Sequence, residues 1–143
     1  MLKGIPPILS PELLKILNEM GHGDELVIGD GNYPAASMAQ RLVRLDGHMV
    51  PPILDAVLQV FPLDRFVDRP AAVMQVVPGD PTVPKIWDEY RKILKKHEPN
   101  NFNEFEEVER FAFYERSLKA YAVIATAESA LYANIILKKG IIE

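Results

Sequence analysis

The chain contains no cysteine among its 143 residues. This absence excludes disulfide bonds, thiolate zinc sites, iron–sulfur clusters and cysteine nucleophiles. Histidine is scarce too, with only His22, His48 and His97 available to carry protons near neutral pH. The sequence around His48 is typical of an exposed turn, and His97 is placed as a cation at a helix C-terminus. His22 is therefore the first candidate for acid–base chemistry.

Positive charge is also in short supply, since 16 basic residues face 20 acidic ones. A net charge of -4 argues against a protein that binds the phosphate backbone of nucleic acids. No apolar run is long enough to span a bilayer, and Met1 is not followed by a signal-peptide pattern. We therefore expect a cytoplasmic protein with no nucleic-acid or membrane partner.

The length of the chain predicts one domain over residues 1–143. Ser10, Pro11 and Glu12 form a typical helix start, and the apolar spacing that follows predicts a helix ending at Gly21. Further helices are expected over 51–61, 84–97 and 110–120, and strands over 26–28, 72–77, 121–126 and 135–137. Strands that alternate with helices predict a layered α/β fold.

His22 lies between two glycines, Gly21 and Gly23, so its ring has few neighbours in the sequence to bury it. A structural interpretation is that it caps the preceding helix; the functional one is that it transfers protons. Asp30 follows the strand expected at 26–28 and favours the functional interpretation, because a carboxylate can orient an imidazole and select its tautomer. We expect His22 and Asp30 to act together.

Two further groups have hydrogen-bonding side chains. Tyr132 and Asn134 are two residues apart, so in an extended segment they project to the same side and suit sugar hydroxyls. Arg110 precedes the aromatic residues Phe111 and Phe113, which can pack against a sugar ring. For each group a half-exposed strand face or a core-facing aromatic stripe is the commoner explanation. No histidine–carboxylate spacing indicates a metal site.

Longer blocks of sequence decide between these interpretations. Residues 1–14 and 19–25, and then 110–116 and 132–140, resemble the L-fucose mutarotase family, which is related to D-ribose pyranase. The resemblance extends over the whole chain. It implies a three-layer α/β/α sandwich with a mixed sheet, and the interconversion of sugar anomers without a cofactor. It also implies a ring-like homo-oligomer, commonly a decamer, with active sites between subunits.

The same resemblance suggests roles for individual residues. His22 matches the catalytic acid of the family, whereas Asp30, Arg110, Tyr132 and Asn134 match sugar-binding positions. Ala133 contributes backbone between the last two. The ribose branch has a histidine where this chain has Arg110, which favours the fucose branch. At Asn32 and Ala36 the chain departs from members that carry histidines there, which bears on substrate preference.

Anomer interconversion needs one acid and one base. The base takes the proton of the anomeric hydroxyl while the acid protonates the ring oxygen, and the roles reverse when the ring closes. We expect His22 to carry the proton, Asp30 to orient it or the sugar, and Tyr132 to be a second proton carrier. Two alternatives remain: a pyranase that interconverts pyranose and furanose forms of D-ribose, and a non-catalytic monosaccharide-binding protein.

Overall fold

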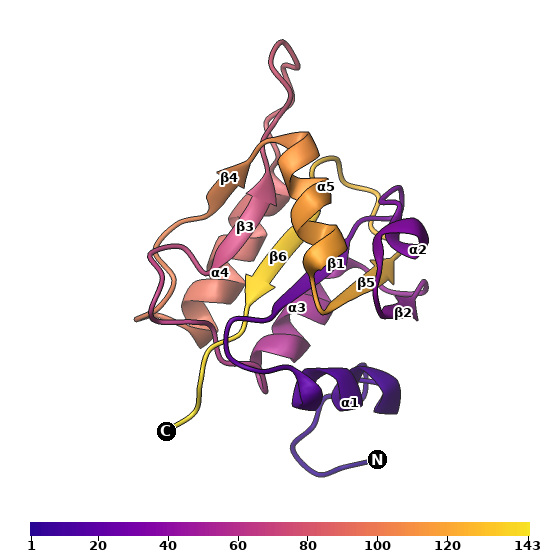
Figure 1. The fold of residues 1–143 in the computed structure, drawn as a ribbon, viewed down its shortest axis with the longest axis vertical. Helices are drawn as coiled ribbons and strands as arrows, with labels where there is room; N and C mark the ends of the chain where they lie inside the picture. Colours follow the sequence, from indigo (N-terminus) through magenta and orange to yellow (C-terminus); the bar gives the residue numbers. More distant parts are fainter.

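The fold is built on a six-stranded mixed sheet with strand order β2-β5-β1-β6-β3-β4 (Figure 1). The structure is a computed structural model that describes the whole chain, Met1–Glu143. In chain order the elements are α1 (Pro11–Glu19), β1 (Glu25–Gly29), α2 (Ala35–Met38), β2 (Leu42–Leu45), α3 (Val50–Leu58), β3 (Ala71–Met74), α4 (Ile86–His97), β4 (Glu106–Val108), α5 (Arg110–Lys119), β5 (Ala122–Thr126) and β6 (Ile135–Lys138).

Only β6 runs against the other strands. It pairs antiparallel with β1 and β3, while β1 with β5, β2 with β5, and β3 with β4 are parallel pairs. The other five strands therefore end at one edge of the sheet, and β6 begins there. We call this the carboxyl edge, and the opposite one, where β1 begins and β6 ends, the amino edge.

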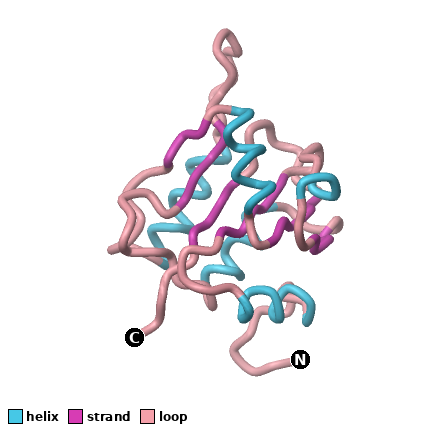
Figure 2. The backbone as a smooth tube through the Cα atoms, viewed as in Figure 1, coloured by secondary structure: helices cyan, strands magenta, loops and turns pink.

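Helices cover both faces of the sheet, as Figures 1 and 2 show. Side chains alternate along β1, so Leu26 and Ile28 join a core of 29 residues with α1, α3 and α4. Val27 faces the other way, into a core of 11 residues that includes Ala35 of α2 and Phe113 of α5. The expected three-layer α/β/α arrangement is confirmed.

Local sequence explains the start of α1 but not its end. The Ser10 hydroxyl accepts a hydrogen bond from the backbone N–H of Leu13 at 3.2 Å, and Pro11 is the first helical residue, as predicted. The helix ends at Glu19 because Met20 is already extended, with φ -62° and ψ 135°. The prediction that Gly21 ends the helix was wrong. In this loop it is Gly23 that has a positive φ, of 88°.

The strand predicted over 72–77 covers only Ala71–Met74 in the structure, because the two strands that pair with it, β4 and β6, are short. The β3 ladder with β6 reaches only Val73, opposite Ile135, and the ladder with β4 reaches Met74, opposite Val108. Residues 75–85 instead form an arm that extends beyond the carboxyl edge (Figures 1 and 2). The chain termini lie at the far end of the molecule from this arm.

Candidate functional site

A polar cavity of about 240 Å³ opens at the carboxyl edge. Three of its residues were predicted from the sequence as site residues: Asp30, Tyr132 and Asn134. They meet because Asp30 follows β1 while the other two precede β6, and β1 and β6 are adjacent and antiparallel. The rest of the lining consists of Asn32, Tyr33, Met74, Asp80, Tyr114 and Leu131.

Asp30 lines this cavity and is held by hydrogen bonds. Its backbone N–H donates to the Asn134 side-chain oxygen at 2.7 Å, and its carboxylate accepts from the backbone N–H of Asn32 at 3.0 Å. Burial raises the pKa of the Asp30 carboxyl above its ordinary value, although backbone N–H groups that bond to it, including that of Ala133, favour the charged form. Such a carboxyl gains and loses a proton closer to neutral pH than an exposed aspartate, which suits acid–base work.

Tyr132 does not lie in an extended segment as expected. Its φ of 56° is the only positive value at a non-glycine residue of the chain. Its phenol donates to Asp80 of the arm at 2.5 Å and accepts from the backbone N–H of Val77 at 3.3 Å. The hydrogen bond to Asp80 raises the pKa of the Tyr132 phenol. The prediction that Tyr132 and Asn134 share one side of a strand was therefore wrong in its geometry, but both line the cavity.

Two side chains of α4 donate hydrogen bonds to the backbone of this turn. The indole N–H of Trp87 donates to the carbonyl of Tyr132 at 2.7 Å, and the phenol of Tyr90 donates to the carbonyl of Ala133 at 2.7 Å. Both side chains are buried. Ala133, which is itself fully buried, thus contributes only its backbone to the site.

Arg110 lies at the same edge but outside the cavity. It is the first residue of α5, two residues after the end of β4, and is exposed. Its guanidinium lies 4.5 Å from the ring centroid of Phe111. It lines a separate small pocket beside the arm. Its positive charge acts on the phenol of Tyr132 and favours the ionised form. Arg110 is therefore close enough to influence the site without contacting the other predicted residues.

His22 lies at the amino edge, where β1 begins. Its Nε2 is 3.1 Å from an oxygen of Asp64, and its ring centroid is 5.5 Å from that of Phe66. The His22 side chain is 45% exposed, whereas that of Asp64 is only 5% exposed. The histidine therefore presents one side of its ring to solvent and the other to a buried carboxylate.

Asp64 is held in the ionised form that can orient the ring. Burial opposes its ionisation, but hydrogen bonds from the backbone N–H of Phe66 and from the His22 ring outweigh burial and lower the pKa of Asp64. An ionised Asp64 requires a proton on Nε2 of His22, which leaves Nδ1 of the neutral ring as a free acceptor. This is the arrangement of a general acid–base histidine with an orienting carboxylate.

The predicted pairing of His22 with Asp30 was wrong within one chain. The five residues of β1 separate them, so the two side chains lie at opposite edges of the sheet. Asp64, which is 42 residues from His22, was not predicted from the sequence as a site residue. Its position depends on the bridge between Leu63 and Lys139, which follows β6. A sequence pattern contains no such long-range pairing.

The other two histidines lie where the sequence predicted. His48 is exposed in a turn, and His97 is the last residue of α4, where its ring lies 2.7 Å from Asp55. No group of three or more histidine or acidic side chains is arranged to hold a metal ion. None of the helices combines the length and the apolar character needed to cross a bilayer.

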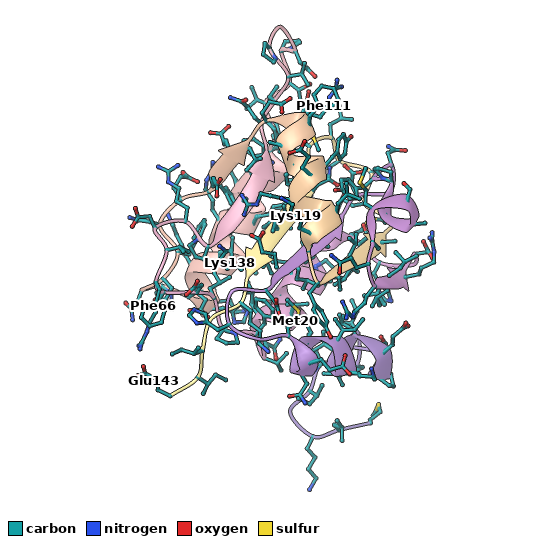
Figure 3. The ribbon with its side chains drawn as sticks, viewed as in Figure 1. Met20, Phe66, Phe111, Lys119, Lys138 and Glu143 are labelled. Carbon is teal, nitrogen blue, oxygen red and sulfur yellow. The ribbon has the colours of Figure 1, made fainter.

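A wide groove of about 890 Å³ adjoins His22 at the amino edge. Its walls are α1, the first residues of the chain and the C-terminal segment, with Leu2, Ile141 and Ile142 among the apolar side chains. In Figure 3, Phe66 and Glu143 mark this end of the molecule, while Phe111 marks the end with the arm. Each end therefore carries exposed apolar side chains next to one part of the predicted site.

Comparison with known proteins identifies the family. Residues 3–142 match the RbsD / FucU transport protein family. The chain belongs to this family. A fucose mutarotase of Danio rerio is 50% identical over 99% of this chain and 95% of its own. The crystal structure of the Streptococcus pneumoniae fucose mutarotase in complex with L-fucose is 50% identical, with a TM-score of 0.92 over 99% of this chain and 100% of that one.

A solved structure of lower sequence identity has the same fold. The structure of Bacillus subtilis RbsD complexed with D-ribose has a TM-score of 0.71 and covers all of both chains, at 22% identity. At that identity the likeness concerns the fold alone. The resemblance inferred from the sequence blocks is confirmed by these comparisons.

Proposed function

We propose that this protein is an L-fucose mutarotase, an isomerase that interconverts the α and β anomers of L-fucose. The observation that carries the proposal is the likeness over the full chain to a fucose mutarotase whose structure holds L-fucose. The site supports it independently. Asp30, Tyr132 and Asn134 provide a small polar cavity, and His22 with Asp64 provides an oriented proton carrier.

The chemistry requires little beyond placed acids and bases. A base removes the proton of the anomeric hydroxyl, an acid protonates the ring oxygen, and the C1–O5 bond breaks to give the open aldehyde. Rotation about C1–C2 and reversal of the proton transfers give the other anomer. Positioned acid–base groups accelerate such steps by about 10²–10⁴-fold. His22 exchanges the proton through Nδ1, while Asp30 and Tyr132 are the complementary carriers and Arg110 and Asn134 bind hydroxyls. Ala133 contributes its backbone to the wall of the site, where Tyr90 holds its carbonyl.

The two parts of this site come from different subunits in our proposal. Within one chain His22 is at the amino edge and Asp30 at the carboxyl edge, so neither cluster has both an acid–base histidine and the sugar cavity. A head-to-tail contact between copies joins unlike edges, and such contacts form a ring when the rotation between neighbours closes. The exposed apolar residues at both ends, such as Ile142 and Phe111, are suited to that contact. From the family resemblance we expect a ring-like decamer.

The assembly is tested by light scattering. The full chain is compared with a variant truncated after Gly140, which lacks the exposed Ile141 and Ile142. We expect the full chain to be a ring-like oligomer and the truncated chain to lose both assembly and activity. A fully active monomer in either sample contradicts a shared site. We also propose that the protein acts in the cytoplasm, which cell fractionation tests.

The activity is tested by exchange NMR on the anomeric protons of L-fucose, with and without the protein. Saturation of one anomer transfers to the other only as fast as the ring opens and closes. We expect the protein to accelerate the transfer for L-fucose and to act more slowly on D-ribose. Line broadening of the sugar without faster exchange indicates a binding protein, and faster exchange for D-ribose than for L-fucose indicates a pyranase.

A further inference from the structure

Tyr132 has a backbone conformation that it does not adopt by itself. Its φ of 56° lies in the left-handed region, which is unfavourable for a bulky side chain. Such residues persist only where their surroundings hold them, and they gather at functional sites. The turn that contains Tyr132 leads directly into Ala133 and Asn134 at the sugar cavity.

Two donors from α4 hold this turn. Trp87 and Tyr90 are three residues apart, so they project from the same face of the helix. Their N–H and O–H groups donate to two consecutive carbonyls, those of Tyr132 and Ala133, each at 2.7 Å. Trp87 is 7% exposed and Tyr90 is fully buried, so neither bond faces open solvent. Loss of either donor leaves a carbonyl without its partner.

The direction of these carbonyls matters for Asp30. A peptide group has its N–H opposite its carbonyl, so peptides whose oxygens face α4 turn their N–H groups toward the cavity. The N–H of Ala133 is close enough to the Asp30 carboxylate to favour its charged form, and the Asn134 side chain accepts from the Asp30 backbone at 2.7 Å. The two donors on α4 are thus connected to Asp30 through one rigid turn.

We propose that Trp87 and Tyr90 are positioning residues for the isomerisation, which hold Tyr132 in its left-handed conformation and thereby place Asp30 and the sugar hydroxyls. Neither residue touches the sugar cavity, so they act through the backbone of residues 132–134. This inference rests on the proposed function for its effect on rate. Its structural part, the conformation of the turn, does not.

The test uses substitutions that remove one donor and keep an aromatic ring. Trp87→Phe removes the indole N–H and Tyr90→Phe removes the phenol. Tyr121→Phe is the matched control, because its phenol donates to Glu19 at the amino edge, away from the sugar cavity and from residues 132–134. Exchange NMR at several L-fucose concentrations separates kcat from KM. Since small misplacements of catalytic groups cost up to about 10²-fold in rate, we expect kcat to fall about tenfold or more in both variants and to be unchanged in the control.

A second measurement is independent of activity. The backbone amide resonances of Ala133 and Asn134 report the conformation of the turn, and we expect them to shift in Trp87→Phe and in Tyr90→Phe but not in Tyr121→Phe. Wild-type kcat in both variants overturns the proposal, as does a reduced kcat with unchanged amide resonances. If the wild-type protein does not accelerate exchange, the proposed function fails. The amide shifts and the affinity for L-fucose then decide whether α4 positions the turn.

Discussion

The imidazole of His22 and the carboxylate of Asp30 lie at opposite ends of β1, one before Glu25 and the other after Gly29. Each strand residue advances the chain by about 3.3 Å, so the two groups do not meet within one subunit. Each has a local partner instead: Asp64 bonds to His22, and Asn134 bonds to the backbone of Asp30. In the proposed shared site, these two clusters are its two halves, and each is already formed within one chain.

His22→Ala should fold and assemble but lose catalysed exchange. The ring is half exposed, so its removal leaves no large cavity in the core. Since placed acid–base groups contribute about 10²–10⁴-fold, we expect a loss of that order in exchange NMR. His48→Ala is the control, because His48 is exposed in a turn and should leave the rate unchanged. Near-normal exchange by His22→Ala rules out its role as proton carrier.

Asp64→Asn should reduce exchange because the orienting charge beside His22 is lost. Replacing the orienting aspartate of a Ser-His-Asp triad by asparagine costs about 10⁴-fold in rate. The control is Asp55→Asn, which alters the other His–Asp pair of the chain, formed with His97 on α4. If Asp55→Asn and Asp64→Asn have equal effects on the rate, Asp64 does not act by orienting His22.

The lowered pKa of Asp64 also predicts a dependence of stability on pH. The ionised carboxylate is favoured in the folded state, so its contribution is present above the unfolded pKa of about 3.9 and is lost as the pH falls through the lower folded value. Urea unfolding across this range should show a loss of stability on acidification that is smaller in Asp64→Asn. An identical pH profile in the two proteins contradicts this assignment.

Asp30 should have the opposite dependence. Its pKa is raised in the folded protein, so the unfolding free energy falls as the pH rises from the unfolded pKa through the folded one. Asp30→Asn removes this dependence, and we expect its stability relative to the wild type to increase over that window while exchange is lost. The measurement is urea unfolding at a series of pH values beside exchange NMR. A variant whose relative stability instead declines with rising pH disproves the assignment.

Arg110 should contribute to the choice of sugar. Losing one hydrogen bond to a charged group costs about 1.5–3 kcal/mol, or roughly tenfold to a hundredfold in rate. We therefore expect Arg110→His to lower exchange of L-fucose by that factor and that of D-ribose much less. Lys119→Ala, at the other end of α5, controls for loss of positive charge. An unchanged ratio of the two rates makes Ala36 the next residue to test.

The sequence predicted those features that depend on neighbouring residues. Ser10 and Pro11 begin α1 because capping is local, and the apolar run 26–28 lies within β1 for the same reason. The short strands β2 and β4 were not predicted. Each is only three or four residues long, and they are the two outermost strands of the sheet.

The geometry of the site depends more than the secondary structure does on contacts between residues far apart in the sequence. The resemblance assigned Asp30, Tyr132 and Asn134, and the structure brings them to one cavity. The left-handed turn at Tyr132 was not predictable, because donors on α4, more than forty positions away, hold it. Asp64 was missed for a similar reason. Its contact with His22 follows from a pairing between residues far apart in the sequence.

The most direct test of the shared site is a subunit complementation measurement. We expect His22→Ala and Asp30→Asn each to be inactive alone, although they alter different parts of the proposed site. The two variants are mixed in equal amounts, dissociated in denaturant, reassembled, and assayed for L-fucose exchange. Random head-to-tail assembly makes about one site in four intact, so we predict recovery of roughly that fraction of wild-type activity. No recovery, in mixed oligomers confirmed to contain both variants, contradicts a site built from His22 of one subunit and Asp30 of its neighbour.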